Sequence, residues 1–137
     1  MSRDLVVQAL QALDWKFVQE SEQDTLSVTF QAHSAPSIKV TLKLAGQRMV
    51  ATTAIDIQLP RAQWAEVLVS ANEYNATQFR PKVYLAISGG SDTALLFGEE
   101  VFDGTTGTTV EHLAAWTGAH ASAFAMASQN VLGVKLG

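Results

Sequence analysis

Three stretches of the chain alternate between buried-type and polar residues, at 26–32, 38–44 and 49–59. Because successive side chains of a β-strand point to opposite faces, this alternation predicts strands with one face buried and one in water. The inward positions are Leu26, Val28, Phe30 and Ala32, then Ile38, Val40, Leu42 and Leu44, then Met49, Ala51, Thr53, Ile55, Ile57 and Leu59. The connections between the stretches are short enough for hairpins, so the pattern predicts an antiparallel sheet.

The stretch Asn72–Tyr84 joins a helix almost directly to a strand. A helix is expected over 61–76, with its apolar face at Trp64, Leu68, Ala71 and Asn75. Pro81 ends this helix, since its ring disfavours an αR residue before it and it has no N–H to donate. The following strand, 82–88, alternates through Val83, Leu85 and Ile87.

The chain before the sheet is predicted to hold one short helix and one short strand. Ser2 is a suitable N-cap, and Val6, Ala9, Leu10 and Leu13 share a helix face. A strand over Trp15–Val18 and a polar turn over 20–24 follow.

The last third is predicted to hold a strand and a long helix. Apolar residues on both sides of the strand 93–103 indicate either a bulge near Gly98 or partial covering of both faces. A helix over 109–130 opens with capping-box spacing, with Thr108 as N-cap and Glu111 as its partner. Its many Gly, Ala and Ser residues permit a close neighbour, and the tail 131–137 is expected to fray.

These elements predict an α+β fold: a two-layer antiparallel sheet with helices on its apolar side, in the order α-β-β-β-β-α-β-β-α. The 137 residues fit one domain, 1–137, and show no repeat, linker or low-complexity segment.

Composition excludes several function classes. The formal net charge of -4 disfavours nucleic-acid and anionic-membrane partners, which require clustered Lys and Arg. The absence of Cys excludes disulfides, Cys-ligated zinc and thiol catalysis. The first residues do not resemble a signal peptide and no apolar stretch is long enough to span a bilayer, so we expect a cytoplasmic protein.

Four features of the chain occur together: Asn72-x-Tyr74-Asn75, then Phe79-Arg80-Pro81-Lys82-x-Tyr84, an acidic strand at 99–103 and a Gly-Thr-rich helix start at 107–111. In these features the chain resembles the YbjN family, whose members are often labelled bacterial sensory transduction regulators. It departs from the family at Arg80, since members often have the aromatic residue directly before Pro, and in the greater length of two alternating strands. The resemblance implies a type III secretion chaperone-like fold, usually dimeric, that holds polypeptide partners.

Chemically active residue types are present without the spacing of a known site. His112 and His120 are eight residues apart, whereas helical metal pairs usually lie at i and i+4, so we interpret them as independent, half-exposed side chains. The acidic set Glu99, Glu100, Asp103 and Glu111 could do acid–base work or bind a hard cation, but a solvated sheet edge that discourages pairing is the better interpretation. Gly89-Gly90-Ser91 lacks phosphate-loop spacing and is interpreted as a hairpin turn. We therefore predict no catalytic residue, no metal ligand and no cofactor.

Partner binding is the remaining possibility. The side chains around the helix–strand joint can stabilise the joint, by bonding its free backbone groups and burying the tyrosine rings. Alternatively, Tyr84 and Lys82 can form a patch that binds a partner. The polar sheet face can be merely solvated or can dock a partner chain or a second subunit. The candidate partner-binding residues are Tyr84, Lys82, Asn72, Asn75, Thr29, Thr41 and Thr52.

We therefore expect a non-enzymatic, chaperone-like or regulatory protein that binds a polypeptide partner and forms a homodimer. Bacterial signalling is the process in which we expect it to act. The alternative is a small-molecule sensor or an enzyme with a pocket between sheet and helices that uses Glu99, Glu100 or the histidines. A third option is a structural subunit of a larger assembly.

Overall fold

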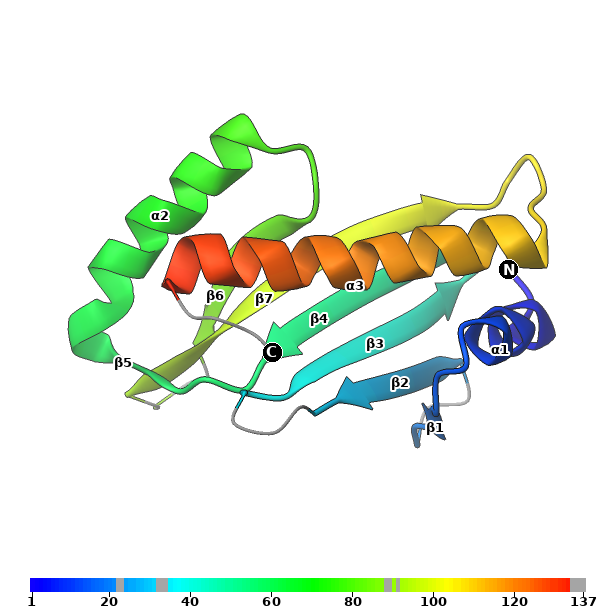
Figure 1. The fold of residues 1–137 in the computed structure, drawn as a ribbon, viewed down its shortest axis with the longest axis horizontal. Coiled ribbons are helices and arrows are strands. Elements are labelled where there is room, and N and C mark those ends of the chain that lie inside the picture. The colour runs from blue at the N-terminus through cyan, green and yellow to red at the C-terminus, as the bar shows by residue number, and fades with distance from the viewer. Residues whose placement is uncertain (22–23, 32–34, 88–89, 91, 134–137) are drawn as a thin grey trace.

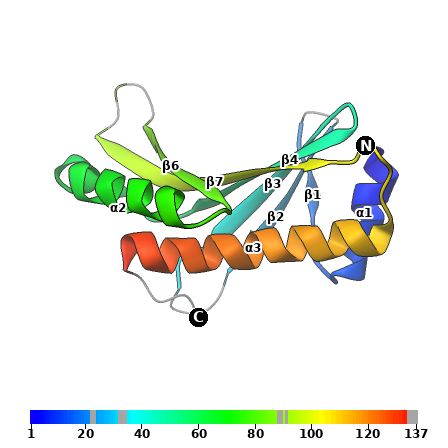
Figure 2. The ribbon, with the colours of Figure 1, turned by 90° about the horizontal axis from the view of Figure 1, so that it is seen from above.

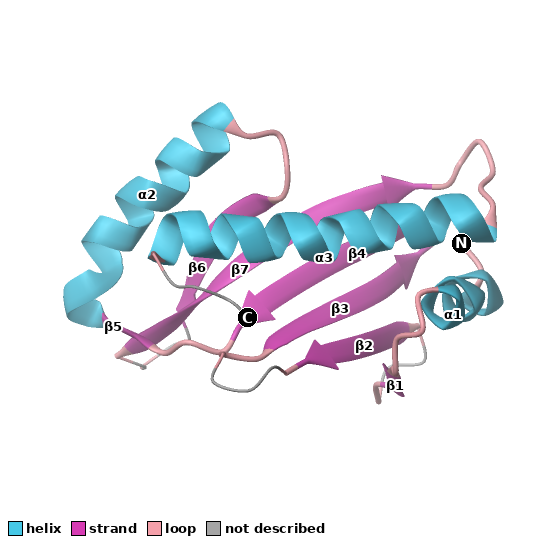
Figure 3. Cartoon of the chain, in the orientation of Figure 1, coloured by secondary structure: helices cyan, strands magenta, loops and turns pink. Residues whose placement is uncertain are grey.

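The computed structural model describes residues 1–21, 24–31, 35–87, 90 and 92–133. Its centre is an antiparallel sheet of seven strands (Figures 1 and 3). The strands are β1 Val18–Gln19, β2 Thr25–Phe30, β3 Ile38–Ala45, β4 Arg48–Ile55, β5 Leu59–Pro60, β6 Lys82–Ile87 and β7 Thr93–Asp103. They follow one another as β1, β2, β3, β4 and β7, and β7 also pairs with β5 and β6.

The three α-helices among the described residues lie on one face of this sheet, as the view in Figure 2 shows. They are α1 Arg3–Ala12, α2 Trp64–Thr77 and α3 Val110–Leu132, with a 3₁₀ turn at Arg61–Gln63 before α2. No described helix covers the opposite face, which we call the open face. The predicted α+β, two-layer antiparallel fold is confirmed.

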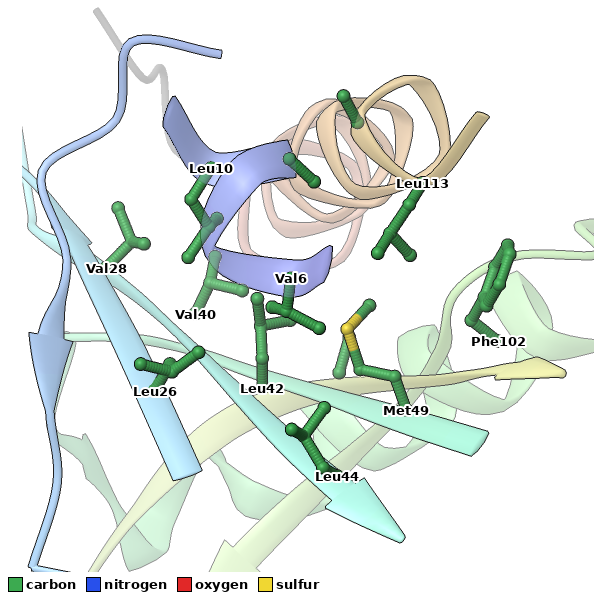
Figure 4. Close-up of a cluster of buried hydrophobic side chains, with 13 residues drawn as sticks. Val6, Leu10, Leu26, Val28, Val40, Leu42, Leu44, Met49, Phe102 and Leu113 are labelled. Atoms are coloured by element: carbon green, nitrogen blue, oxygen red, sulfur yellow. The ribbon is translucent and has the colours of Figure 1, made fainter. Parts of the chain in front are cut away.

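The core between helices and sheet has two parts. Beneath α1 and the start of α3, Val6 and Leu10 pack over Leu26, Leu42 and Met49 (Figure 4). Beneath α2 and the end of α3, the buried side chains are Ile55, Leu59, Val67, Ala71, Tyr74, Val83, Leu96, Phe124, Ala127 and Val131. Each fully buried large aliphatic or aromatic side chain contributes about 1.5–3 kcal/mol, so these two clusters hold the layers together.

The first helix begins as predicted, but the strand predicted after it is wrong. Ser2 Oγ accepts from the Leu5 N–H, and Val6, Ala9 and Leu10 are buried. After the helix, Asp14 adopts a left-handed φ of 57°, and the Trp15 N–H bonds back to the Leu10 carbonyl. This Schellman-type ending keeps Trp15 against the helix. The strand therefore starts only at Val18, as β1.

The third alternating stretch is shorter than predicted. β4 ends at Ile55, where the Ile57 N–H bonds to the Ile55 carbonyl in a turn. Leu59 then belongs to β5 and pairs with Ala94 of β7. Alternation alone could not show this break, because inward positions at Ile55 and Leu59 keep the same parity across it.

Strand β7 has no bulge at Gly98, so this sequence interpretation is wrong. Its register runs unbroken along β4 and along β6. Ala94, Leu96 and Phe102 are buried under the helices, whereas Leu95 and Phe97 on the open face are half-buried. Gly98 is needed for packing instead. A Cβ there would lie 2.4 Å from Phe124 Cδ1.

Helix α2 buries a different face from the one predicted. Val67, Ala71 and Tyr74 are buried, whereas Leu68 is 50% exposed. One residue rotates a helix face by about 100°. Tyr74 determines the observed face, because its ring is buried and its hydroxyl donates to the Arg80 carbonyl at 2.7 Å.

Both ends of α3 differ from the prediction. The N-cap is Thr109, whose Oγ1 accepts from the His112 N–H, so the capping box from Thr108 to Glu111 is wrong. The helix continues to Leu132, and Val131 is buried, so fraying from 131 is also wrong. Gly133, with φ 69°, ends the helix in the left-handed conformation. The remaining tail and the positions Ala32, His33, Gly89 and Ser91 lie outside the described residues.

Candidate functional site

Strand pairing gathers five of the predicted partner-binding residues on the open face. Across β3, β4, β7 and β6, the register aligns Thr41 with Thr52, Thr52 with Glu99, and Glu99 with Lys82. The neighbouring row contains Thr29, Lys39, Ala54, Phe97 and Tyr84. Residues that are up to 70 positions apart in the chain, from Thr29 to Glu99, therefore share one surface.

The open face has an apolar half over β7 and β6. The rings of Tyr84 and Phe97 stack with centroids 5.8 Å apart, and Val101 is 53% exposed. The Tyr84 hydroxyl donates to Glu99 Oε2 at 3.4 Å. Burial, and then the charge of Glu99, raise the pKa of Tyr84, so the phenol stays protonated and remains a donor.

The other half, over β2, β3 and β4, is polar and contains a hollow of about 520 Å³. We call it the polar hollow. Its lining residues are Glu20, Ser21, Thr25, Lys39, Thr41, Lys43, Val50 and Thr52. A second hollow of about 260 Å³ continues the surface past Thr29 and Lys39 to Leu95. The open face is thus hollowed, with hydroxyls and lysines at one side and aromatic rings at the other.

Glu20 is held at the rim of the polar hollow. Its Oε1 accepts from Ser27 Oγ at 2.6 Å and lies 3.2 Å from Lys39 Nζ. The hydrogen bond from Ser27, and then the hydrogen bond and charge of Lys39, lower the pKa of Glu20, so this carboxylate is ionised near neutral pH.

The two predicted asparagines do not lie on the open face. Asn75 binds the backbone of β6: its Nδ2 donates to the Val83 carbonyl at 2.8 Å and its Oδ1 accepts from the Val83 N–H at 2.9 Å. A neighbouring strand would make the same two hydrogen bonds to the Val83 backbone. Asn75 therefore occupies part of the edge of β6 that another strand could otherwise pair with. Asn72 is exposed on α2. The contacts of Asn75 favour a structural role at the joint.

A second group of polar residues lies buried between the sheet and α3, and sequence reasoning did not assemble it. His120 is fully buried, which corrects its interpretation as half-exposed. Its Nδ1 lies 2.6 Å from Glu100 Oε1 and its Nε2 lies 2.7 Å from Thr53 Oγ1. At the margin of the group, the Arg80 side chain is 40% exposed, and its Nε lies 2.7 Å from Glu100 Oε2 as an ion pair. We call Thr53, Arg80, Glu100 and His120 the buried network.

The interpretation of Glu99 and Glu100 as a solvated sheet edge is wrong, because β7 is paired on both sides. Burial would raise the pKa of Glu100, but the hydrogen bond and charge of His120 and the charge of Arg80 together lower it. The ionised carboxylate can only accept, so Nδ1 of His120 carries a proton. The ring is therefore oriented, with Nε2 facing Thr53.

Aromatic rings complete the surroundings of the buried network. Trp116 stacks on His120 with centroids 5.8 Å apart, and the Arg80 guanidinium lies 5.6 Å from the Trp116 ring centre. Two signals in the sequence could have revealed the network. Glu100 is an even number of positions from Leu96 and Phe102, so its side chain points to the same face of the strand. His120 continues the helical spacing of Leu113 and Thr117.

Neither group forms a metal centre: among the described residues, no three His, Cys, Asp or Glu side chains are placed to hold an ion. In the same part of the chain, no helix is both long and apolar enough to cross a membrane.

Comparison with known proteins gives a structural match. The fold is similar to the crystal structure of YbjN from E. coli, titled "a putative transcription regulator", with a TM-score of 0.77 over 100% of this chain and 97% of the other. The two sequences are 14% identical, so the likeness shows the fold alone. No family model matches the chain, and no curated protein matches it by sequence.

Proposed function

We propose that this protein is a non-enzymatic, chaperone-like or regulatory protein that binds a polypeptide partner on the open face, and that two copies associate. The observation that carries the proposal is the one-sided covering of the sheet: helices pack on one face, and the other combines hollows, hydroxyls and half-exposed aromatic rings. Interfaces typically combine aromatic anchors with polar groups, and both kinds of side chain are present on this face.

The structural neighbour supports a regulatory role, since its title describes a regulator. We assign the role here to protein binding and not to nucleic-acid binding, because the net charge of -4 opposes contact with phosphates.

The alternative, an enzyme or small-molecule sensor with a pocket under the helices, has one observation in its favour, the convergence of Glu100 and His120. These residues line none of the hollows described above, and the Trp116 ring stacks on His120. The open face is the better candidate.

Peptide binding tests the proposal. Short peptides selected by the wild-type protein from a random displayed library would be synthesised, and their affinity measured by fluorescence anisotropy. Thr52→Arg, in the middle of the open face, is expected to weaken binding at least tenfold, about 1.4 kcal/mol. Asn72→Arg adds the same charge on exposed α2 and is expected to leave binding unchanged. Equal losses in both variants, or no selected peptide, would count against the open face.

Light scattering behind gel filtration, at two protein concentrations, tests the association of two copies. A stable species of twice the monomer mass is expected. A monomer at both concentrations would contradict this part of the proposal and leave the peptide experiment as the test of the open face.

A further inference from the structure

Strand β2 is longer than the strand that pairs with its outer edge. β1 covers that edge with the two residues Val18–Gln19 only, although β2 continues to Phe30. The shortness of β1 follows from the turn after α1, because the Trp15 N–H bonds back to the Leu10 carbonyl and holds this segment against the helix. In the part of the chain that the structure describes, no strand pairs with the outer edge at the end of β2.

The backbone of Thr29 points to this free edge. The Glu20 N–H bonds to the Thr25 carbonyl, so Thr25 faces β1. In an antiparallel sheet alternate residues face the same neighbour, so Ser27 and Thr29 face that way too. The register of β1 would place Lys16 opposite Thr29, but no backbone hydrogen bond joins these two residues. Within the described residues, the outward N–H and C=O of the exposed Thr29 therefore have no partner.

A hollow of about 660 Å³ lies beside this edge, and we call it the edge hollow. Its lining comes from the end of β2, from the segment after α1 and from the residues that lead into β3: Asp14, Trp15, Lys16, Val28, Thr29, Phe30, Gln31, Ala35, Pro36 and Ile38. The rings of Trp15 and Phe30 meet edge to face, with centroids 4.7 Å apart. The edge hollow thus combines a free strand edge with an aromatic wall, at a volume typical of binding sites.

The backbone chemistry of the edge selects an extended polypeptide. An N–H and a C=O that point the same way are matched by the C=O and N–H of another extended chain, as in recognition by strand addition. The sheet already contains such an arrangement, because β4 and β5 lie end to end along one edge of β7. An added strand in line with β1 would share the edge of β2 in the same manner.

We propose that an extended segment of the polypeptide partner adds to β2 at Thr29, in line with β1, and places an apolar side chain against Trp15 and Phe30. This inference rests on the proposed function, because it specifies how the same partner binds. Thr29 lines both the edge hollow and the hollow of about 260 Å³ on the open face, so the two surfaces are continuous. An apolar side chain matches the remaining wall, which includes Val28 and Ile38.

Backbone methylation of a bound peptide tests the strand pairing. Peptides selected by the wild-type protein from the random displayed library would be synthesised with one N-methyl group at each position in turn. Fluorescence anisotropy would measure their affinities for the whole chain. Methylation of the residue that donates to the Thr29 carbonyl is expected to weaken binding about tenfold. Methylation of the residues on either side of it is expected to have a much smaller effect, because their N–H groups point away from β2.

Variants of the protein locate the added strand. Thr29→Pro removes the outward N–H without breaking a hydrogen bond of the fold, because an edge strand tolerates proline where the N–H faces outward. Thr29→Val keeps that N–H and is expected to bind about tenfold more tightly than Thr29→Pro. Ala35→Trp fills the edge hollow and is expected to weaken binding about tenfold. Ala119→Trp, on the exposed side of α3, is the matched control and is expected to bind like the wild type.

The outcomes separate strand addition from the proposed function. Wild-type affinity in Ala35→Trp, or in Thr29→Pro with an unchanged circular dichroism spectrum, would overturn strand addition at β2. A methylation scan without position dependence would overturn it as well. If the same peptides still lose affinity for Thr52→Arg, polypeptide binding by the open face stands without the edge. Failure to select any peptide would overturn both proposals.

Discussion

Glu99 and Glu100 are adjacent in β7 and have opposite surroundings. Glu100 points toward the helices, its side chain is 11% exposed, and it contacts His120 and Arg80. Glu99 points to the open face, where Tyr84 Oη donates to it at 3.4 Å. The step of one residue along a strand decides between the two environments. A carboxylate under the helices needs several donors, whereas a carboxylate on the open face remains available to a partner.

The largest expected effect distinguishes these two residues. Glu100→Gln removes the carboxylate that accepts from buried His120 and pairs with Arg80; because the Arg80 side chain is 40% exposed, the ion pair is only partly buried, and we expect a loss of about 1.5–3 kcal/mol, typical of a hydrogen bond to a charged group. Glu99→Gln, the matched control, is expected to change the free energy of unfolding by less than about 0.5 kcal/mol. Urea denaturation of both variants measures the difference. Similar values for the two would show that the buried network contributes no special stability.

Two glycines provide the second contrast. Gly98→Ala would place a Cβ 2.4 Å from Phe124 Cδ1 and 3.1 Å from Pro81 Cγ, and such overpacking costs about 1–3 kcal/mol. Gly118→Ala on α3 would meet only Leu13 Cδ2, at 3.4 Å, and is expected to stabilise the helix by about 0.5–1 kcal/mol. Thermal unfolding would reveal the opposite signs. A harmless Gly98→Ala would refute the close packing of α3 on β7.

The two asparagines give a third contrast. Asn75→Ala removes both hydrogen bonds to Val83, with an expected loss of about 1–2 kcal/mol. Asn72→Ala, on the same helix, removes no hydrogen bond to Val83 and is expected to have almost no effect on the free energy of unfolding. If the two variants unfold at the same urea concentration, Asn75 does not support the β6 edge.

The pH dependence of stability gives the smallest expected effect. The pKa of Glu100 is lowered in the folded protein from its ordinary value of 4.5. Its contribution is therefore fully present above that value and is lost as the pH falls through the lower, folded pKa. The difference in unfolding free energy between wild type and Glu100→Gln should shrink on acidification, and a difference that stays constant would contradict the lowered pKa.

The sequence predicted the sheet well, because alternation reports directly which side chains of β2, β3 and β4 face the core. It also predicted the shared surface of Thr41, Thr52 and Tyr84 in part, as polar positions of separate strands. The spacing of Glu100 and His120 places each on the inward face of its own element, but it could not predict that the two side chains meet. Bringing Arg80, Glu100 and His120 together depends on the packing of α3 over β7, and no local pattern encodes that contact.

Local interactions explain the remaining errors. The αL residue Asp14 delays β1, and the buried hydroxyl-bonded Tyr74 turns the face of α2. A hydrogen-bonded turn causes the first effect and a side-chain hydrogen bond causes the second. Each one outweighs the preference that the periodicity of the sequence predicts.

Photo-crosslinking tests the open face as the partner surface most directly. A benzophenone side chain would replace Val101, which is 53% exposed on the open face, or, in the matched variant, Ser122 on the exposed side of α3. After irradiation with a selected, bound peptide, mass spectrometry would measure the crosslinked fraction. We predict crosslinking from position 101 and none from position 122. Crosslinking from 122 alone would place the partner on the helices and contradict the account.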